Sequence, residues 1–323
     1  MHITSKMVAA ALALLAAGSV SAQTVQGPVM GYVVDSHSRN LRPVLGVPGA
    51  AVVGATVKAD NPIVPAAVSP AGDYALVWMN EGGKGAVWTP AGELKPLAGL
   101  SAATYAVALS PQGAAAAFYS PEESVVRVVS GLPDSPSDAV EFRLDTVGAP
   151  LASFAVSDDG AVVLCAAAGP GAEAIALSPS GELARIPFSA AITALAFVPS
   201  THDAVIADGA EALLVKGVDA HGSTSRLDAG KLGAISAVAV TGDSRQVLLA
   251  ASNGKIAIAG LASGAPTTVV DCHCAPEGLF RMNGDGAWRL DGYRGASIHV
   301  LDTASAEPRI VVVTASMGPG NTQ

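Results

Sequence analysis

The stretch "AVALSPQGAAAAFY", residues 106–119, joins two short apolar runs through the sequence Ser-Pro-Gln-Gly. Proline at the second position of a turn presets its φ angle, and the glycine two residues later closes a type I turn. The two runs are apolar at nearly every position, as strands buried on both faces are. This stretch therefore predicts a β-hairpin inside a packed β-structure.

Hairpins of the same form recur along the chain. They begin at "AAVSPAGDYALVW" (66–78) and continue through "SFAVSDDGAVVLCA" (153–166) to "GLFRMNGDGAWRL" (278–290). The first turn residues are spaced by 41, 47, 42, 42 and 42 residues, and they are Ser69, Ser110, Ser157, Pro199, Thr241 and Asn283. A fixed period of this length indicates a repeat architecture.

A second hairpin lies between successive members of this series. Examples are "GAVWTPAGELKPL" (85–97) and "AIALSPSGELARI" (174–186), which share the pattern Pro-x-Gly-Glu-Leu. Each unit of about 42 residues then holds four strands, a to d. Four-stranded units of about 40–45 residues predict an all-β fold, a β-propeller.

The turn sequences "SPAG", "SPQG" and "SDDG" resemble the "SPDG" turn of WD40-like and YVTN-type β-propeller repeat proteins. The resemblance covers roughly residues 30–314 and concerns the repeat, not one function. The last three units depart from the turn pattern, and the Gly-His and Trp-Asp dipeptides of true WD40 repeats are missing. Because some YVTN-like propellers are lactonases, the resemblance leaves an enzyme possible.

The number of blades depends on how the N-terminal part is read. The segment "GYVVDSHSRNLRPVLGV" (31–47) is interpreted as a c–d hairpin like that of residues 85–97. It would belong to an incomplete first blade, which favours seven blades. Six blades with an added N-terminal hairpin are the alternative.

The first 22 residues have the order of a secretory signal. Lys6 precedes the apolar run 7–18, and small residues at 20–22 form a cleavage site before Gln23. We expect a signal peptide at 1–22, a propeller domain at 23–316 and a flexible tail at 317–323. The protein is then exported to the periplasm or beyond the cell, and no later segment is long and apolar enough to span a membrane.

Composition restricts the partners. The chain has 323 residues, 50% of them hydrophobic, and a formal net charge of −9 without any Lys/Arg cluster, which argues against nucleic acid as a partner.

The chain has three cysteines, so at least one thiol is free or pairs with another chain. Cys165 lies in an apolar run and is expected to be buried and unpaired.

The loop "CHCAPEG", residues 272–278, contains the one cluster of reactive residues, in a d-to-a connection. A structural zinc site needs about four ligands, and catalytic redox pairs normally have the spacing Cys-x-x-Cys. A local disulfide between Cys272 and Cys274 is favoured, while metal binding, redox catalysis and free or intermolecular thiols stay open. No metal, cofactor or catalytic set is predicted.

The b–c loops share a face with the d–a connections, and acidic residues outnumber basic ones in them. The candidate binding residues are Glu81, Glu122, Glu123, Glu173, Asp208, Glu211 and Asp291. They fit an acidic rim for a basic partner as well as ordinary solvated loops. The predicted function is an exported, non-catalytic binding or scaffold propeller for a protein or small-molecule partner. The alternative is a hydrolase or lactonase acting at the channel mouth.

Overall fold

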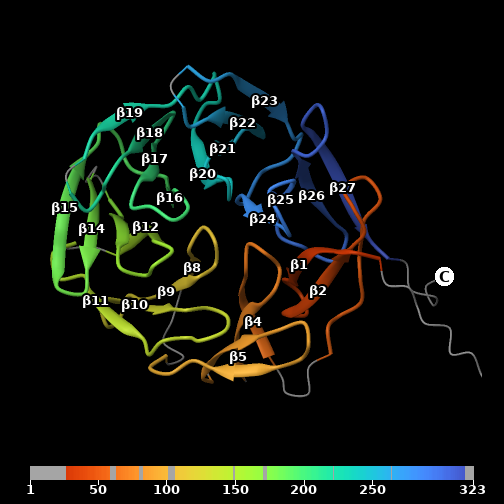
Figure 1. Cartoon of the computed structure of the whole chain (residues 1–323). Coiled ribbons are helices and arrows are strands. Elements are labelled where there is room, and N and C mark those ends of the chain that lie inside the picture. Colours follow the sequence, from red (N-terminus) through yellow and green to blue (C-terminus); the bar gives the residue numbers. More distant parts are fainter. Residues whose placement is uncertain are drawn as a thin grey trace, which may run out of the picture.

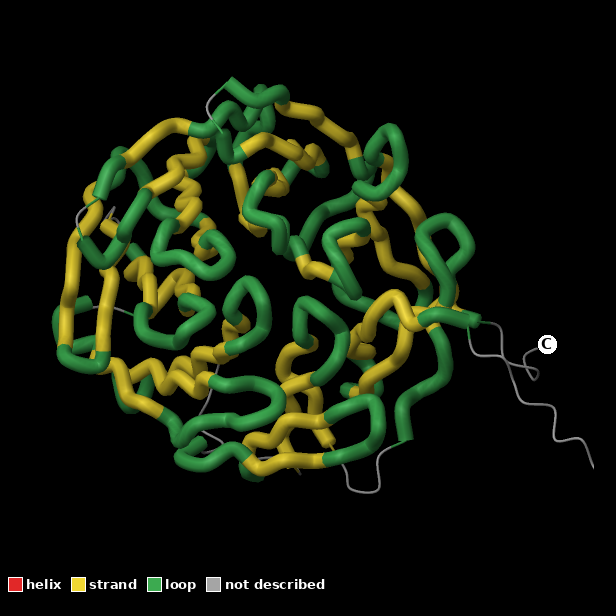
Figure 2. The backbone as a smooth tube through the Cα atoms, viewed as in Figure 1, coloured by secondary structure: helices red, strands yellow, loops and turns green. Residues whose placement is uncertain are grey.

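The computed structural model describes residues 27–58, 63–79, 83–100, 106–147, 150–169, 173–220, 222–262 and 264–316. Within these ranges the regular structure is β-strand, with no α-helix, as Figure 2 shows. The predicted signal peptide and tail, residues 1–22 and 317–323, lie outside the described residues.

Five sheets have four antiparallel strands each, joined in chain order. The first three sheets are β4 (Ile63–Val68), β5 (Ala75–Met79), β6 (Gly85–Trp88), β7 (Leu94–Pro96); β8 (Ala106–Leu109), β9 (Ala115–Ser120), β10 (Val125–Ser130), β11 (Val140–Arg143); and β12 (Leu151–Val156), β13 (Val163–Ala167), β14 (Glu173–Ser178), β15 (Gly181–Pro187). The next two are β16 (Ala194–Phe197), β17 (Ala204–Asp208), β18 (Glu211–Val215), β19 (Thr224–Arg226); and β20 (Ile235–Val240), β21 (Gln246–Ala251), β22 (Lys255–Gly260), β23 (Thr267–Asp271).

The sixth sheet has seven strands because it joins the two ends of the chain. Its strands are β1 (Val29–Asp35), β2 (Asn40–Leu45), β3 (Val52–Val53), β24 (Phe280–Arg281), β25 (Ala287–Arg289), β26 (Ser297–Asp302) and β27 (Arg309–Ala315). The three N-terminal strands meet the four C-terminal ones where β3 pairs with β27 in parallel, Val52 opposite Thr314.

The sheets are arranged as blades around a central axis (Figure 1). Their middle strands are buried on both faces, as all six residues of β9 are, because adjacent blades pack face to face. The apolar clusters accordingly lie between neighbouring sheets, such as Val205 and Leu214 against Val247 and Leu249. In its described residues the molecule is a β-propeller with six four-stranded blades and one three-stranded blade.

Four of the six turns predicted between the first two strands of a blade have the expected geometry. In the turn at Ser69, the Gly72 N–H donates to the Ser69 carbonyl at 2.9 Å and Gly72 has a φ of +69°. The hydroxyl of Ser69 also accepts the Tyr74 N–H at 3.2 Å, so the first turn residue caps the hairpin. This local hydrogen bonding explains why serine or threonine begins four of the six turns.

Two of the six predicted turn positions are displaced by one residue. The N–H of Val198 and that of Met282, not those of Pro199 and Asn283, donate across their turns, to Asp203 and Ala287. In these two turns the residue with a positive φ is the third residue of the turn, Ser200 or Gly284, instead of the fourth. Neither Val198 nor Met282 has a hydroxyl that could cap its turn, so residue type does not mark the first turn position there.

The N-terminal hairpin is not the c–d hairpin that the sequence suggested. β1 starts beside the β24–β25 turn, where the Asn283 N–H donates to the Met30 carbonyl, and ends beside Tyr293 in the β25–β26 connection, where a parallel bridge joins Asp35 to Tyr293. β1 therefore runs in the direction of a b strand and is the innermost strand of a blade whose described residues include no strand a. Its turn resembles the β26–β27 turn, with Asp followed by Arg seven residues later in both, which explains the sequence assignment.

Candidate functional site

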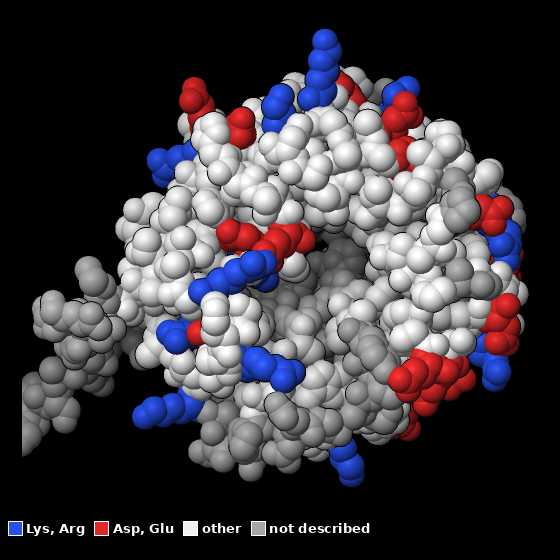
Figure 3. All heavy atoms as spheres, turned by 180° about the vertical axis from the view of Figure 1, so that it is seen from behind, with Lys and Arg blue, Asp and Glu red and all other residues white. Residues whose placement is uncertain are grey.

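The central channel is a hollow that the inner strands of the described blades enclose. It encloses about 380 Å³ and receives residues from the innermost strand of every blade, from Tyr32 in β1 to Phe280 in β24. Figure 3, which views the molecule from behind, shows the hollow at its centre. The inner strands pair on one side only, so their free backbone edges and mostly aliphatic or aromatic side chains form the wall.

Among the described residues of the wall, three side chains can ionise: Tyr32, Arg281 and Arg289. Burial raises the pKa of Tyr32, which keeps its hydroxyl protonated. The Arg281 guanidinium lies 3.4 Å from Asp285 Oδ1, so its charge has a carboxylate partner. Its Nε also lies 3.4 Å from the Pro70 carbonyl oxygen, although Nη1 is buried without a hydrogen bond.

Arg289 is placed differently. It ends β25, directly opposite Phe280 of β24, and its guanidinium carbon lies 4.1 Å from the centre of the Phe280 ring. Its Nη1 donates to the Asp291 carbonyl at 2.5 Å. Burial lowers the pKa of Arg289 to about 10, against the opposing attraction of Asp291 and Glu277, so the side chain is still cationic at neutral pH.

The cysteine loop lies beside this arginine. Cys272 and Cys274 form a disulfide in the connection from β23 to β24, and the Cys272 N–H donates to the Gly254 carbonyl at 2.8 Å. Cys272 packs with Trp288 and Leu290 of the last blade. The loop is therefore anchored to two blades, and Cys165 is a buried free thiol far from it in sequence.

Glu277, in the same loop, holds the β25–β26 connection. Its Oε2 accepts the Gly292 N–H at 3.0 Å and its Oε1 pairs with Arg294. Asp291, one residue before Gly292, accepts the backbone N–H of His299 at 2.8 Å and contacts His299 Nδ1 at 2.7 Å. The disulfide loop thus supports the segment whose carbonyl oxygen binds Arg289.

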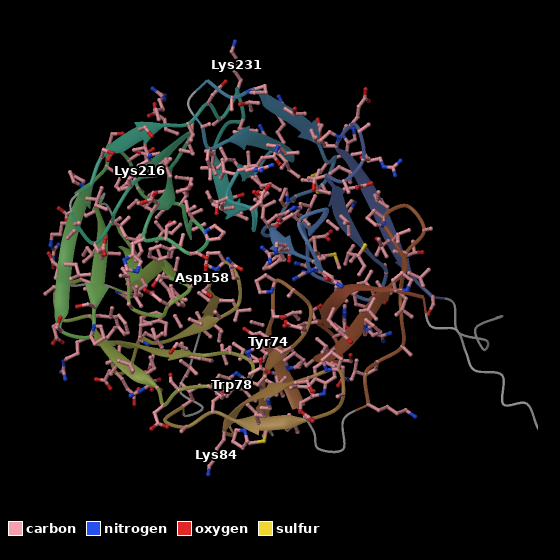
Figure 4. The ribbon with its side chains drawn as sticks, viewed as in Figure 1. Tyr74, Trp78, Lys84, Asp158, Lys216 and Lys231 are labelled. Carbon is pink, nitrogen blue, oxygen red and sulfur yellow. A yellow bond between two sulfur atoms is a disulfide. The ribbon has the colours of Figure 1, made fainter. Side chains whose placement is uncertain are left out.

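At the opposite mouth, turns from successive blades are tied together. The Asp158 carboxylate accepts the N–H groups of Gln112 and Ser200, both at 2.8 Å, from the two flanking blades. Figure 4 shows Asp158 near the central opening, whereas Lys84 and Lys231 lie at the outer rim. This mouth is built from turns that brace one another.

The structure gives most of the predicted acidic residues local partners. Glu123 pairs with Arg127, Glu211 with Arg226, and Glu173 with Arg185 at 3.0 Å. Asp208 is buried and accepts the Ser189 hydroxyl at 3.0 Å. Glu81 lies outside the described residues, and Glu122 has a partner of its own. These local pairs offset much of the acidic charge that the sequence shows.

Two further features are absent from the described residues. No group of three or more His, Cys, Asp or Glu side chains could hold a metal ion in this part of the chain. Nor does it contain a helix suited in length and hydropathy to crossing a membrane.

The sequence reasoning missed Arg281, Arg289 and Phe280. None belongs to a known motif, and the acidic residues of the b–c loops predicted a binding site at the rim instead of in the channel. The available signal was the position of two arginines in the apolar repeat "LFRMNGDGAWRL" (279–290), where the equivalent positions of other units are apolar.

Comparisons with known proteins agree with this architecture. No protein-family model and no curated protein matches the sequence. Virginiamycin B lyase from Staphylococcus aureus is similar in structure, with a TM-score of 0.53 and 10% identity over 80% of this chain and 85% of that one.

Two other solved structures are similar to different degrees. A streptogramin B lyase structure has a TM-score of 0.53 and 10% identity, covering 80% of this chain and 83% of the other. The Swd1 β-propeller domain from Myceliophteria thermophila has a TM-score of 0.47 and 13% identity, covering 64% and 68%, which is too distant for comparison in detail. At these identities likeness shows the fold alone, and the chain is a β-propeller repeat protein.

Proposed function

We propose that this protein is an exported, non-catalytic binding propeller whose ligand occupies the central channel. The observation that supports it is the wall itself, which seven inner strands build mainly from aliphatic and aromatic side chains around about 380 Å³. That volume lies at the lower end of the range of about 300–1,000 Å³ for ligand pockets. Such a wall removes apolar ligand surface from water and fixes the ligand through a few polar groups.

The test uses a neutral apolar probe, N-phenyl-1-naphthylamine, whose fluorescence rises in an apolar environment. We expect the probe to bind saturably at one site. Because Trp288 lies in the channel wall, it should quench or enhance the fluorescence of the bound probe. Ala108→Phe should fill the space and weaken binding by about tenfold or more, because Ala108 lines the channel. Ala91→Phe, in an exposed turn, is the matched control and should bind as the wild type does.

If a folded Ala108→Phe variant binds the probe with the same affinity as the wild type, the channel is not the ligand site. Export is tested separately by the intact mass of the protein recovered outside the cytoplasm, which should begin near Gln23. Recovery of a chain that retains Met1 would reject the signal-peptide cleavage.

The hydrolase alternative has one contact in its favour. His299 Nδ1 and Asp291 Oδ2 are 2.7 Å apart in the β25–β26 region, the type of pair that orients a general base. The pair lies outside the channel lining. Turnover of aryl esters or lactones that is lost in His299→Gln and kept in the exposed control His273→Gln would support the enzyme and contradict the binding function.

A further inference from the structure

Arg289 carries a positive charge that no carboxylate neutralises at contact distance. Among the described residues, no acidic oxygen lies within 4.0 Å of its guanidinium, and its hydrogen bond goes to a backbone carbonyl. The two carboxylates that attract it are engaged elsewhere, Asp291 with His299 and Glu277 with Arg294 and Gly292. The folded protein therefore has a largely desolvated guanidinium with unused donors.

Those unused donors are not buried, and Arg289 lines the channel. Arg289 is part of the channel wall and retains partial exposure, while no nitrogen of Arg289 is buried without a partner. Arg281, on the neighbouring strand, contrasts with it because its carboxylate partner Asp285 lies 3.4 Å away. A charge that is removed from water and left unpaired is costly, and an anion in the channel would offset that cost.

The surroundings of Arg289 define the rest of the ligand. Phe280 holds the guanidinium from one side and is itself 44% exposed, so an apolar surface adjoins the cation. Beyond it the wall continues through the aliphatic inner strands of the other blades. A ligand that satisfies both features has one anionic group and an apolar body.

We propose, on the basis of the function above, that the channel binds a monocarboxylate with an apolar chain or ring, its carboxylate paired with Arg289 and its apolar part lying along Phe280 and the inner strands. A carboxylate matches the guanidinium because two parallel N–H donors can bind its two oxygens. A free fatty acid and an aromatic acid share this chemistry.

The test compares three ligands of equal chain length as competitors of N-phenyl-1-naphthylamine: decanoate, decanol and decylamine. The wild type should bind decanoate at least about tenfold more tightly than decanol, as expected for a charge-assisted pair, and decylamine most weakly. Phenylacetate against 2-phenylethanol, in a second arm, distinguishes an aromatic from an aliphatic body.

Arg289→Met should abolish the preference for decanoate while leaving decanol binding within about twofold of the wild type. Arg143→Met removes the same charge from an exposed pair with Asp145 and should keep the preference. If Arg289→Met does not fold, Arg289→Lys replaces it and should retain a reduced preference, because a lysine cannot make the paired contact.

The outcomes separate this proposal from the one on which it rests. If the wild type binds decanoate and decanol equally and Ala108→Phe binds neither, the carboxylate proposal is wrong and the channel is still a binding site. A decanoate preference that survives Arg289→Met also overturns the carboxylate proposal. A wild type that binds no probe and no competitor contradicts the proposed function itself.

Discussion

Nε2 of His202 lies 3.0 Å from Oδ2 of Asp159, across the boundary between the β12–β15 and β16–β19 blades. The other ring nitrogen of His202, Nδ1, lies 2.6 Å from Oδ2 of Asp219, so the imidazole sits between two carboxylates. Desolvation lowers the pKa of His202, but the hydrogen bonds and the attraction of Asp219 and Asp159 outweigh it, and the pKa is raised above 6.5. The contact between these two blades is therefore strongest when His202 is protonated.

A histidine with a raised pKa in the folded state contributes stability that is fully present below pH 6.5 and is lost as the pH rises through the folded pKa. His202→Asn should lower the free energy of unfolding by roughly 1 kcal/mol more at pH 5.5 than at pH 8.5. Urea unfolding at the two pH values measures this, with the exposed His273→Asn as control. The same difference at both pH values would contradict the prediction.

A second prediction concerns Asp158, whose two oxygens accept N–H groups from the β8–β9 and β16–β17 turns. Asp158→Asn keeps the shape but turns an NH₂ group toward one of these donors. We expect a loss of roughly 1–2 kcal/mol in the free energy of unfolding, since two charge-assisted bonds are affected at a partly exposed position. Urea denaturation measures it, and Asp134→Asn, an exposed aspartate in the β10–β11 connection, is the matched control. Equal stability of the two variants would show that this brace is unimportant.

The repeat could be predicted because its turns carry local signals. Ser69, Ser110, Ser157 and Thr241 cap their own hairpins through side-chain hydrogen bonds, so residue type and spacing reveal the turn directly. Val198 and Met282 have no hydroxyl, and their turns were placed one residue late. The repeat length of 41–47 residues is not affected by these one-residue errors, because each blade packs against its neighbours through the same buried strands.

The channel site could not be predicted in the same way because its parts come together only in the ring. Arg289 matters through its position over Phe280 and through the engagement of Asp291 and Glu277 by other groups. Local sequence shows none of these relationships. The b–c loops are the opposite case. Their acidic residues are evident in the sequence, but the sequence does not show that arginines on neighbouring strands pair with them, as Arg185 does with Glu173.

A third prediction concerns the thiols. Cys165 has no exposed surface, and burial raises the pKa of its thiol, so it should not react with a thiol reagent in the native protein. We expect no reactive thiol in the native state, one after unfolding without reductant and three after unfolding with reductant. Mass spectrometry of the alkylated peptides counts them. A bridge between Cys165 and either Cys272 or Cys274 would refute the pairing.

Substitution at Cys165 extends this test to stability. Cys165→Ser places an unpartnered hydroxyl in the apolar cluster with Ile175 and Leu177 and should cost roughly 1–3 kcal/mol. Cys165→Ala removes the same sulfur without adding a polar group and should cost about 1 kcal/mol. A serine variant as stable as the alanine variant would mean that the site is more hydrated than its packing indicates.

The last prediction compares two Asp–Arg pairs, in which the arginine side chains are 25% exposed for Arg42 and 59% exposed for Arg309. Arg42 lies 3.0 Å from Asp35 and Arg309 lies 3.1 Å from Asp302, at the same spacing in sequence, and both aspartate side chains are 5% exposed. Each aspartate also accepts two backbone N–H groups of its own turn. The two arginines therefore neutralise equivalent buried charges.

Arg42 does more, because it lies where the ring closes. Its Nη1 donates to the Gly54 carbonyl at 3.2 Å, and its guanidinium carbon lies 5.5 Å from the centre of the Tyr293 ring in the last blade. Next to it, the Ser36 N–H donates to the Tyr293 carbonyl at 3.0 Å. One side chain thus joins β1, the segment after β3 and the β25–β26 connection.

Both Arg42→Met and Arg309→Met should destabilise the protein, since each leaves a buried carboxylate without its counter-ion. Arg42→Met should cost roughly 1–2 kcal/mol more, from the lost hydrogen bond and the lost cation–π contact. Hydrogen exchange should rise in β1 and around Tyr293 only in Arg42→Met, and around the β26–β27 turn only in Arg309→Met. Equal losses of stability with the same exchange pattern would show that Arg42 neutralises Asp35 and contributes nothing to closing the ring.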